Sequence, residues 1–370
     1  MPIFGWEMRR SVAVLLGLWA GSVFATDSPS GLFDLSYGVS SSASIQVVAR
    51  ASAPRPARLE DLLFTPEVAM PVPVHAPELV VSTPARYENL WDRIRDGFAI
   101  PEVESPLVDR WQAWYLARPQ MLNGILERSR RYLFYVVEEI SKRGMPMELA
   151  LLPMVESGYN PAALSSAQAA GLWQFIPSTA RKYSLHNTPD YDARRDIVAS
   201  TGAALDYLQS LYELFGDWHL ALASYNWGEK SVAQAIARNA AKGLPTDYLS
   251  LSLPQETRDY VPKLLALKNL IGYPSAFHLE LQPIANQPYF TAIAIARSLD
   301  LTFAARLANV SLEELSSLNP GFARAAASNN ATGALMLPSE HAEAFLANWN
   351  IYHARNRKTK TLKRGRTSMP

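Results

Sequence analysis

Apolar residues recur at helical spacing through the middle of this chain of 370 residues, from about residue 87 to residue 271. No segment before about residue 285 alternates apolar and polar residues in the way that a half-buried strand does. We therefore expect a helical core. The predicted helical segments are 90–98, 108–115, 119–143, 146–157, 197–215, 219–225, 230–239 and 256–271.

The composition excludes several classes of protein and of site. With 48% hydrophobic residues the chain can bury a core, which excludes a disordered or collagen-like chain. The absence of cysteine removes disulfides, thiolate nucleophiles and cysteine-ligated metals. The net charge is +1, and none of the six histidines stands in an H-E-x-x-H arrangement. We therefore expect no metal, no cofactor and no nucleic-acid partner, and we expect a monomer.

Residues 1–25 have the layout of a secretory signal peptide. Arg9 and Arg10 precede an apolar run at 11–20, and small residues follow as far as Thr26. That run is too short to span a bilayer core of about 30 Å, although an uncleaved anchor or a chance apolar stretch stays open as the alternative. Ser22 stands where a lipid-anchored export signal needs a cysteine, so we expect an exported protein that is not a lipoprotein.

The segments on either side of the helical part differ from it in composition. Residues 26–87 are rich in Ser, Ala, Val and Pro, which favours an extended spacer. Residues 285–340 contain two predicted short helices, at 291–298 and 312–318, followed by Asn-Pro-Gly and a late apolar run. We expect the basic tail at 341–370 to be unstructured, with weak contact to anionic envelope components as the alternative.

Glu156 is the candidate catalytic residue. A helix places its carboxylate on the same side as Leu149 and Leu152, and Gly158 ends that helix directly afterwards. Apolar neighbours and the negative end of the helix dipole both raise the pKa of a carboxyl group. A proton held near neutral pH suits a general acid. The alternative is an exposed glutamate at a frayed helix end.

Aromatic residues with a few amides and hydroxyls follow Glu156 over the next 120 residues. Aromatic rings can cover the apolar face of a sugar, and polar groups can bond its hydroxyls, so the set is typical of a carbohydrate cleft. Taken singly, each of these residues has core packing as its alternative role. The candidates are Ser157, Gln174, Tyr225, Asn226, Glu256 and Tyr260.

Four short motifs in order give the chain a family resemblance over residues 105–272, with a weaker extension to about 340. They are Glu-Ser at 156–157, Gly-Leu-Trp-Gln at 171–174, Ser-Tyr-Asn-Trp-Gly at 224–228 and Pro-x-Glu-Thr-x-x-Tyr-Val at 254–261. The sequence resembles the soluble-lytic-transglycosylase-like family of murein-degrading enzymes, in the lysozyme-like superfamily. Within that family it is most similar to the membrane-bound lytic murein transglycosylase D type.

The resemblance implies a fold class and a domain organisation. The fold would be mainly α, with a lysozyme-like (goose-type) helical catalytic domain at 88–280 that includes an N-terminal helical extension. A small α+β segment at 285–340 would follow, similar to a degenerate LysM glycan-binding module. A small domain that packs against the catalytic one is the alternative reading of that segment.

The resemblance also implies a reaction and a place for it. Glu156 would protonate the oxygen of the β-1,4 bond between N-acetylmuramic acid and N-acetylglucosamine, and that bond would break. Glu156 would then act as a base, and the product would carry 1,6-anhydromuramoyl ends. Ser157 would orient Glu156 or bond the acetamido group of the sugar. Gln174 and Tyr225 would hold the substrate and stabilise developing charge, and Asn226 would support the loop. Glu256 and Tyr260 would lie beside the cleft. The partner would be the glycan strands of peptidoglycan, in the periplasm.

Two positions depart from the family pattern. Gln168 stands where a glycine usually precedes the Gly-Leu-Trp-Gln motif, so we expect local remodelling if that position needs a positive φ. Trp227 replaces the alanine of the Tyr-Asn-Ala-Gly motif. Two other functions stay open: a goose-type muramidase that hydrolyses the same bond, and a catalytically inactive murein-binding scaffold.

Overall fold

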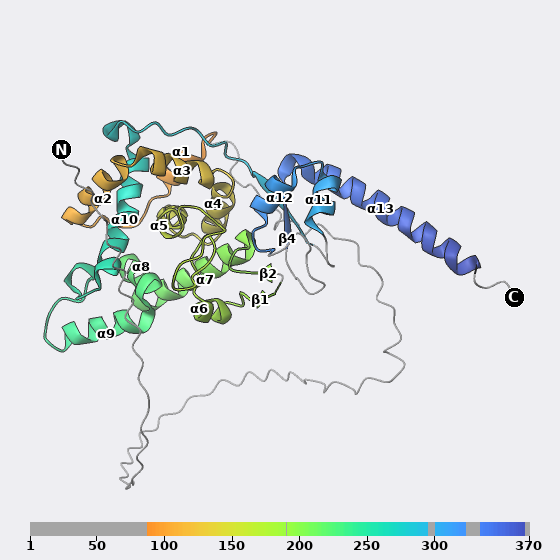
Figure 1. Ribbon diagram of the computed structural model, residues 1–370. Coiled ribbons are helices and arrows are strands. Elements are labelled where there is room, and N and C mark those ends of the chain that lie inside the picture. The colour runs from red at the N-terminus through yellow and green to blue at the C-terminus, as the bar shows by residue number, and fades with distance from the viewer. Residues whose placement is uncertain (1–86, 190, 295–299, 323–333, 367–370) are drawn as a thin grey trace, which may run out of the picture. The chain divides into compact units, whose positions relative to one another are not determined.

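The computed structural model of the chain describes residues 87–189, 191–294, 300–322 and 334–366, with side chains as far as residue 354 (Figure 1). These residues belong to one compact unit that spans 65–370. The expected signal peptide, and the expected spacer except its last residue, lie outside the described residues.

The described chain between residues 90 and 277 is mostly helical, which confirms the mainly α fold class. Two strands of two residues each, too short to alternate visibly in the sequence, pair antiparallel: β1 (Asn187–Thr188) and β2 (Tyr191–Asp192). The helices are α1 (Leu90–Asp96), α2 (Pro106–Leu116), α3 (Pro119–Ser129), α4 (Leu133–Lys142), η2 (Met147–Leu151), α5 (Leu152–Glu156), α6 (Pro177–Lys182), α7 (Ile197–Phe215), α8 (Trp218–Trp227), α9 (Glu229–Ala240), η3 (Tyr248–Ser250), α10 (Gln255–Gly272) and η4 (Pro274–Phe277).

Both ends of α7 are fixed by their caps, and the predicted bounds 197–215 are confirmed. The side chain of Asp196 accepts a hydrogen bond of 2.8 Å from the backbone N–H of Ala199. Gly216 follows the last helical residue with a φ of 65°, a left-handed conformation that glycine adopts without strain.

The predicted helical segment 119–143 is wrong in one respect, because the chain breaks it at residues 130–132. The hydroxyl of Ser129 donates to the carbonyl of Leu126 at 2.6 Å, and Tyr132 takes a φ of −120°. The phenol of Tyr132 donates to the carbonyl of Ser317 at 3.1 Å. The break at residues 130–132 thus coincides with a tertiary contact to the C-terminal segment, and local helix propensity alone does not predict it.

Helix α10 is the central support of the helical part. It packs against α2, α8 and η2, and Figure 1 shows α2 and α10 side by side. Its N-terminal half also reaches α5, which carries Glu156. The buried apolar residues of α10 are Tyr260, Val261, Leu264, Leu265, Ala266, Leu267, Leu270 and Ile271.

Helix α1 is held by residues that follow η4, about 190 positions later in the chain. The backbone N–H of Leu90 donates to the carbonyl of Ile284 at 2.8 Å, and the indole of Trp91 donates to the carbonyl of Gln282 at 3.1 Å. Leu90 and Trp91 are 0% and 1% exposed. The segment 282–286 thus completes the burial of α1.

The C-terminal segment is built from two strands with two helices between them. These are β3 (Phe290–Ala294), α11 (Leu301–Ala308), α12 (Leu312–Leu318) and β4 (Ala334–Pro338), and the strands pair antiparallel with Phe290 opposite Pro338. The predicted helix at 312–318 is confirmed. The predicted helix at 291–298 is wrong where the structure describes it, because pairing with β4 fixes 290–294 as a strand.

Asn319 joins the end of α12 to β4. Its side-chain amide donates to the carbonyls of Leu315 and Met336, each at 2.7 Å, and its side-chain oxygen accepts from the N–H of Met336 at 2.8 Å. The residue is 1% exposed. These bonds give hydrogen-bond partners to the carbonyl of Leu315 and to both backbone groups of Met336. Asn319 is therefore part of the core of this segment.

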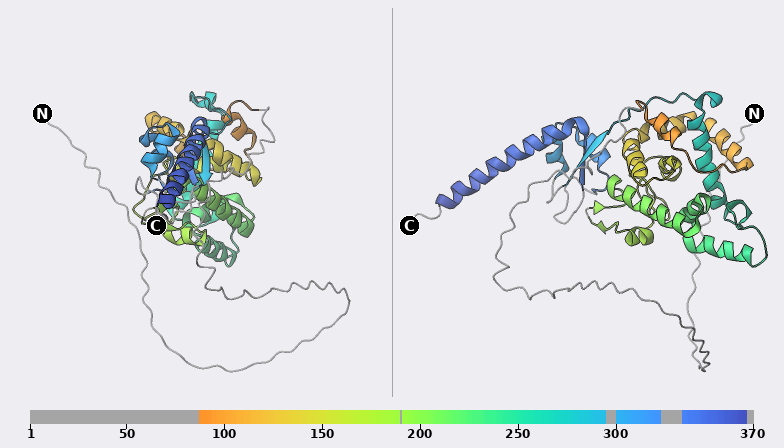
Figure 2. Two further views of the ribbon diagram at one scale, coloured as in Figure 1. Left: turned by 90° about the vertical axis from the view of Figure 1, so that its right-hand side faces the viewer. Right: turned by 180° about the vertical axis from the view of Figure 1, so that it is seen from behind.

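The expected unstructured tail is helical as far as it is described, in α13 (Ser339–Arg366). Ala342, Phe345 and Trp349 recur at helical spacing and are buried, and α13 packs on α11, β3 and β4. The helix then continues beyond the elements that its first half contacts (Figure 2). None of the helices described here, α13 included, combines the length and apolar character that a membrane span requires.

Candidate active site

Glu156 is the last residue of α5, at the point where the helix opens into a loop. Leu149 and Leu152, which share its side of the chain, are both 0% exposed. Gly158 then takes a φ of 59°, which turns the chain out of the helix. The predicted placement of a carboxyl group among apolar side chains at a helix end is what the structure contains.

The phenol of Tyr260 donates a hydrogen bond to Oε1 of Glu156. Burial raises the pKa of Glu156 to about 7, the Tyr260 hydrogen bond and the charge of Lys263 oppose this rise, and the charge of Glu256 adds to it. The expected direction of the pKa shift is confirmed. Near pH 7 the carboxyl group can therefore both give and take a proton.

Tyr225 comes to the same site from α8. Its hydroxyl donates to the backbone carbonyl of Trp173 at 2.9 Å. Burial raises the pKa of Tyr225 far above its usual range, and the negative charge of Glu156 adds to the rise. Tyr225 therefore stays a neutral hydrogen-bond donor at any physiological pH.

Ser157 and Gln174 bond to the backbone of the loop at residues 171–174. The hydroxyl of Ser157 donates to the carbonyl of Leu172 at 2.8 Å. The side-chain amide of Gln174 donates to the carbonyl of Gly171 at 2.8 Å, and Gln174 itself has a φ of 50°. The Glu-Ser and Gly-Leu-Trp-Gln motifs are thus brought together, with Ser157 as the link.

Gly171 is required by a close approach between two backbones. It has a φ of 84°, and a Cβ atom at this position would lie 1.8 Å from the carbonyl oxygen of Arg194. Next to it Trp173 is fully buried, and its indole donates to Thr201 Oγ1 at 3.0 Å. The first and third residues of the motif therefore serve to anchor the loop on α7 and the chain before it.

Gln168 takes the left-handed conformation itself. Its φ is 61°, and its carbonyl accepts a hydrogen bond of 2.7 Å from the guanidinium of Arg194. Arg194 is in turn paired with Asp192 at 2.8 Å. Gln168 itself therefore takes the positive φ, which strains the backbone of a residue that has a Cβ atom, and Arg194 holds the turn in place of the remodelling that we expected.

Asn226 and Trp227 end α8 beside the site. Oδ1 of Asn226 accepts a hydrogen bond of 2.8 Å from the hydroxyl of Thr257, the second residue after Gln255 in α10. Trp227 is half-buried against the core, and Gly228 follows with a φ of 92°. Asn226 thus ties the end of α8 to the beginning of α10, as a loop support would.

The remaining predicted residue, Glu256, is exposed on the first turn of α10. Sequence reasoning missed Lys263, which lies one turn after Tyr260 on the same helix. Its Nζ atom lies 4.7 Å from the ring centroid of Trp111 on α2. The spacing of three residues from Tyr260 was the signal that could have found it. In the described part of the chain, no three His, Asp or Glu residues group as a metal site would need.

Comparison with known proteins gives two family matches. Residues 136–245 match the transglycosylase SLT domain, and residues 289–353 match the LysM-like domain of lytic transglycosylase MltD. The first match covers the five predicted residues from Glu156 to Asn226. It stops short of α10, which carries Glu256 and Tyr260.

Individual relatives agree with the family matches. The chain is 38% identical over 256 residues to the membrane-bound lytic murein transglycosylase D of Escherichia coli K12, which covers 69% of this chain and 57% of that protein. It is 47% identical over 137 residues to the membrane-bound lytic murein transglycosylase C of Glaesserella parasuis, and this match covers 33% of this chain and 37% of that protein. The crystal structure of the soluble lytic transglycosylase SLT70 of Escherichia coli aligns with a TM-score of 0.31 and 25% identity, over 40% of this chain and 24% of that one. The two family matches and the relative from Escherichia coli K12 confirm the resemblance expected from the sequence.

Proposed function

We propose that this chain, which carries a transglycosylase SLT domain and an MltD LysM-like domain, is a lytic transglycosylase of peptidoglycan. The chain spans little more than half the length of its curated relative from Escherichia coli K12, so the activity of the whole protein is part of the proposal. The observation that carries it is the carboxyl group of Glu156, with a pKa of about 7 and a hydrogen bond from Tyr260.

In the first step Glu156 acts as the general acid. Burial raises its pKa to about 7, so near neutral pH it can give a proton to the oxygen between N-acetylmuramic acid and N-acetylglucosamine as that bond breaks. Tyr225 and Gln174 hold the substrate and stabilise the developing charge, and Ser157 orients the carboxyl group. The bond from Ser157 to the Leu172 carbonyl supports this role, because it fixes the residue next to the acid.

In the second step the Glu156 carboxylate acts as the base. It takes the proton from the C6 hydroxyl of the muramoyl residue, whose oxygen then bonds to C1 and closes the 1,6-anhydro ring. No water is added: the C6 oxygen replaces the N-acetylglucosamine oxygen at C1, and the leaving sugar departs with the proton that Glu156 gave it. A single carboxyl group with a pKa near the working pH suits both steps, since it is equally ready to lose and to regain its proton.

Hydrolysis of the same bond, as by a goose-type muramidase, is the second candidate, and the observation that favours it is Glu256. A hydrolase of this kind needs a second carboxylate to activate water or to form a covalent bond, and Glu256 is close enough to act on the pKa of Glu156. Glu256 is exposed on the first turn of α10, and a water-activating carboxylate needs a fixed place opposite the acid. This favours the single-carboxyl mechanism.

The rest of the proposal concerns domains and location. The catalytic domain would be residues 88–280, and the segment 285–340 would bind glycan as a LysM-like module. The chain would be exported by the signal peptide at 1–25 and act in the periplasm as a monomer without a lipid anchor. The SLT match from 136 to 245 and the LysM-like match from 289 to 353 support the two-domain division.

Mass analysis of the products tests the reaction. The purified full-length chain is incubated with murein sacculi, with Glu156→Gln as the control. Anhydromuramoyl ends from the unchanged chain, and none from the variant, would support the proposal. Ends heavier by one water would assign the muramidase reaction instead. Binding to sacculi without any cleavage would assign a scaffold role.

A further inference from the structure

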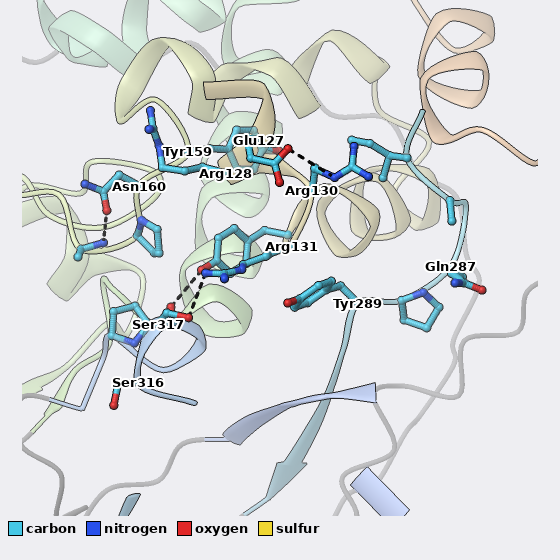
Figure 3. Close-up of a pocket in the computed structure, with 17 residues that line it drawn as sticks. Glu127, Arg128, Arg130, Arg131, Tyr159, Asn160, Gln287, Tyr289, Ser316 and Ser317 are labelled. Atoms are coloured by element: carbon cyan, nitrogen blue, oxygen red, sulfur yellow. Dashed lines mark hydrogen bonds and ion pairs between the residues drawn. The ribbon is translucent and has the colours of Figure 1, made fainter. Parts of the chain in front are cut away.

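A cavity rich in arginine is lined in part by the loop that follows Glu156. It has a volume of about 670 Å³. Its walls come from the end of α3 and the turn after it, from the loop at 159–162, from residues 284–289 and from the end of α12 (Figure 3). Glu156 itself does not line this cavity.

Three arginines of one short segment define the charge of the cavity. Arg128 is exposed, Arg130 and Arg131 are half-buried, and Glu127 is the one acidic residue among those that line it. Glu314, just outside, pairs with Arg131 at 2.9 Å and accepts a hydrogen bond of 2.8 Å from Tyr289. With both carboxylates counted, an excess of one positive charge remains for a ligand.

The arginines are held in place by the protein. Arg128 donates through Nε to the carbonyl of Gly158 at 2.8 Å, and Arg130 donates to the carbonyl of Pro283 at 3.1 Å. Arg131 bonds Ser317 at 3.1 Å in addition to its pair with Glu314. Each guanidinium has five N–H donors, so these contacts leave donors free while they fix the side chains. Fixed guanidinium groups suit carboxylates, which they can bind through two parallel hydrogen bonds.

The cavity is close to the catalytic acid along the chain. Gly158, which holds Arg128, is two residues after Glu156, a distance of at most about 7 Å. Asn160, which lines the cavity, is at most about 14 Å away along an extended chain. A peptide of four extended residues also spans about 14 Å. A peptide attached to the sugar at Glu156 can therefore reach the arginines.

We infer that this cavity binds the carboxylates of the peptide stem carried by the muramoyl residue at the cleavage site. The inference rests on the proposed function. In murein the sugars that Glu156 would cleave between are uncharged once the lactyl group carries a peptide, and the carboxylates are on that peptide. The apolar walls formed by Pro161, Ile284 and Pro288 suit peptide side chains more than sugar hydroxyls.

Two forms of one substrate test the inference. Murein strands with their peptide stems are compared with the same strands after an amidase has removed the stems. The unchanged chain should have a lower KM for the stem-bearing strands. Arg128→Gln and Arg131→Gln should each raise that KM by about tenfold, the effect of one lost charge-assisted pair, and change the KM for stripped strands by less than about twofold.

Matched controls separate anion binding from structure. Glu314→Gln breaks the same ion pair as Arg131→Gln but keeps the cation, so it should retain the low KM. Arg238→Gln removes an exposed cation of α9, away from the residues that line the cavity, and should change neither KM. If Glu314→Gln behaves like Arg131→Gln, or if the arginine variants raise both KM values equally, the role of the arginines is structural and the inference is wrong.

Direct binding keeps the test independent of cleavage. Calorimetry with a free stem tetrapeptide should detect binding to the full chain, weaker binding to both arginine variants, and none for a peptide whose carboxylates are amidated. Absence of cleavage together with carboxylate-dependent binding would contradict the proposed function and support the cavity assignment. Cleavage of both substrates with equal KM, and no binding of the peptide, would overturn the assignment and leave the proposed function standing.

Discussion

Tyr260 on α10 donates its phenolic proton to the carboxyl group of Glu156 at the end of α5. The two residues are 104 positions apart, and the bond forms because α10 packs against α5. Burial raises the pKa of Tyr260 far above its usual range, so the phenol remains a donor at physiological pH. The bond fixes the carboxyl group and limits the rise of its pKa, and several predictions of pH dependence depend on it.

Tyr260→Phe should raise the pKa of Glu156 above its value of about 7, because the hydrogen bond that lowers it is lost. The proposed acid step needs the protonated carboxyl group, so activity should fall as the pH rises through this pKa. The alkaline limb of the kcat/KM profile should therefore move to higher pH, while the maximum value falls because the carboxyl group is less well oriented. An unmoved limb would show that the phenol does not bond the carboxyl group in solution.

Lys263→Met and Glu256→Gln should move the same limb in opposite directions. The charge of Lys263 lowers the pKa of Glu156, so its removal should move the alkaline limb to higher pH. The charge of Glu256 raises this pKa, so its removal should move the limb to lower pH. Each shift should shrink in high salt, since both groups reach solvent. Retention of most activity in Glu256→Gln would also speak against Glu256 as a second catalytic carboxylate. A loss of several hundredfold would favour hydrolysis.

Glu156→Gln should make the protein more stable at alkaline pH. The folded-state pKa of about 7 lies above the ordinary 4.5, so the folded protein holds this proton more tightly than the unfolded chain. The stabilisation from the neutral form is present below about pH 4.5 and is lost as the pH rises through 7. Above pH 7 the free energy of unfolding of the variant should exceed that of the unchanged chain by up to about 3 kcal/mol. Below about pH 4 the two free energies of unfolding should be equal. Thermal unfolding at pH 4 and pH 8 measures the difference.

Gln168→Gly should stabilise the fold by about 1 kcal/mol. Gln168 has a φ of 61°, which costs a residue with a Cβ atom about 1–2 kcal/mol. Glycine removes this strain, but its more flexible unfolded state offsets part of the stabilisation. The bond from Arg194 goes to the backbone carbonyl and is kept. Gly171→Ala, three residues on, is the contrasting variant, because its Cβ atom would overlap the Arg194 carbonyl and unfold the loop. Urea unfolding compares the two, and a destabilised Gln168→Gly would show that the side chain of Gln168 makes a contribution larger than its strain.

Asn319→Ala should destabilise the C-terminal segment by roughly 2–4 kcal/mol. Three hydrogen bonds are lost, and the buried N–H of Met336 is left without its acceptor. Ser316→Ala on the same helix is the matched control, as its hydroxyl makes no such set of bonds with β4. Hydrogen exchange at the amides of β4 measures the effect, and unchanged protection would contradict the role given to Asn319.

The sequence predicts the helix ends and the burial around Glu156 better than it predicts the structure of the C-terminal segment. Glu156 could be placed because a helix period and a terminating glycine are local signals, and burial then determines the direction of its pKa shift. The bounds of α7 were predictable because Asp196 and Gly216 cap it within one residue on each side. Lys263 was missed because its effect depends on α2 and α5, which only the tertiary structure brings to it.

Elements that depend on pairing partners were the ones predicted wrongly. Residues 290–294 contain alanine and suit a helix locally, but β4 offers them a ladder of backbone hydrogen bonds. The tail was expected to be unstructured because of its charge, while Phe345 and Trp349 bury one side of its helix. In both cases a contact distant in sequence outweighs the local preference.

The bonds between α1 and residues 282–286 have a consequence for the order in which the chain is made. Roughly 190 residues must be synthesised between Trp91 and its partner Gln282. At about 5–20 residues per second this takes roughly 10 to 40 s. During this time other helices are available for α1 to pack on, but the segment 282–286 that completes its burial has not been made. Leu90 and Trp91, among the least exposed residues of the finished protein, are therefore a stretch of apolar surface that a chaperone would meet on the growing chain.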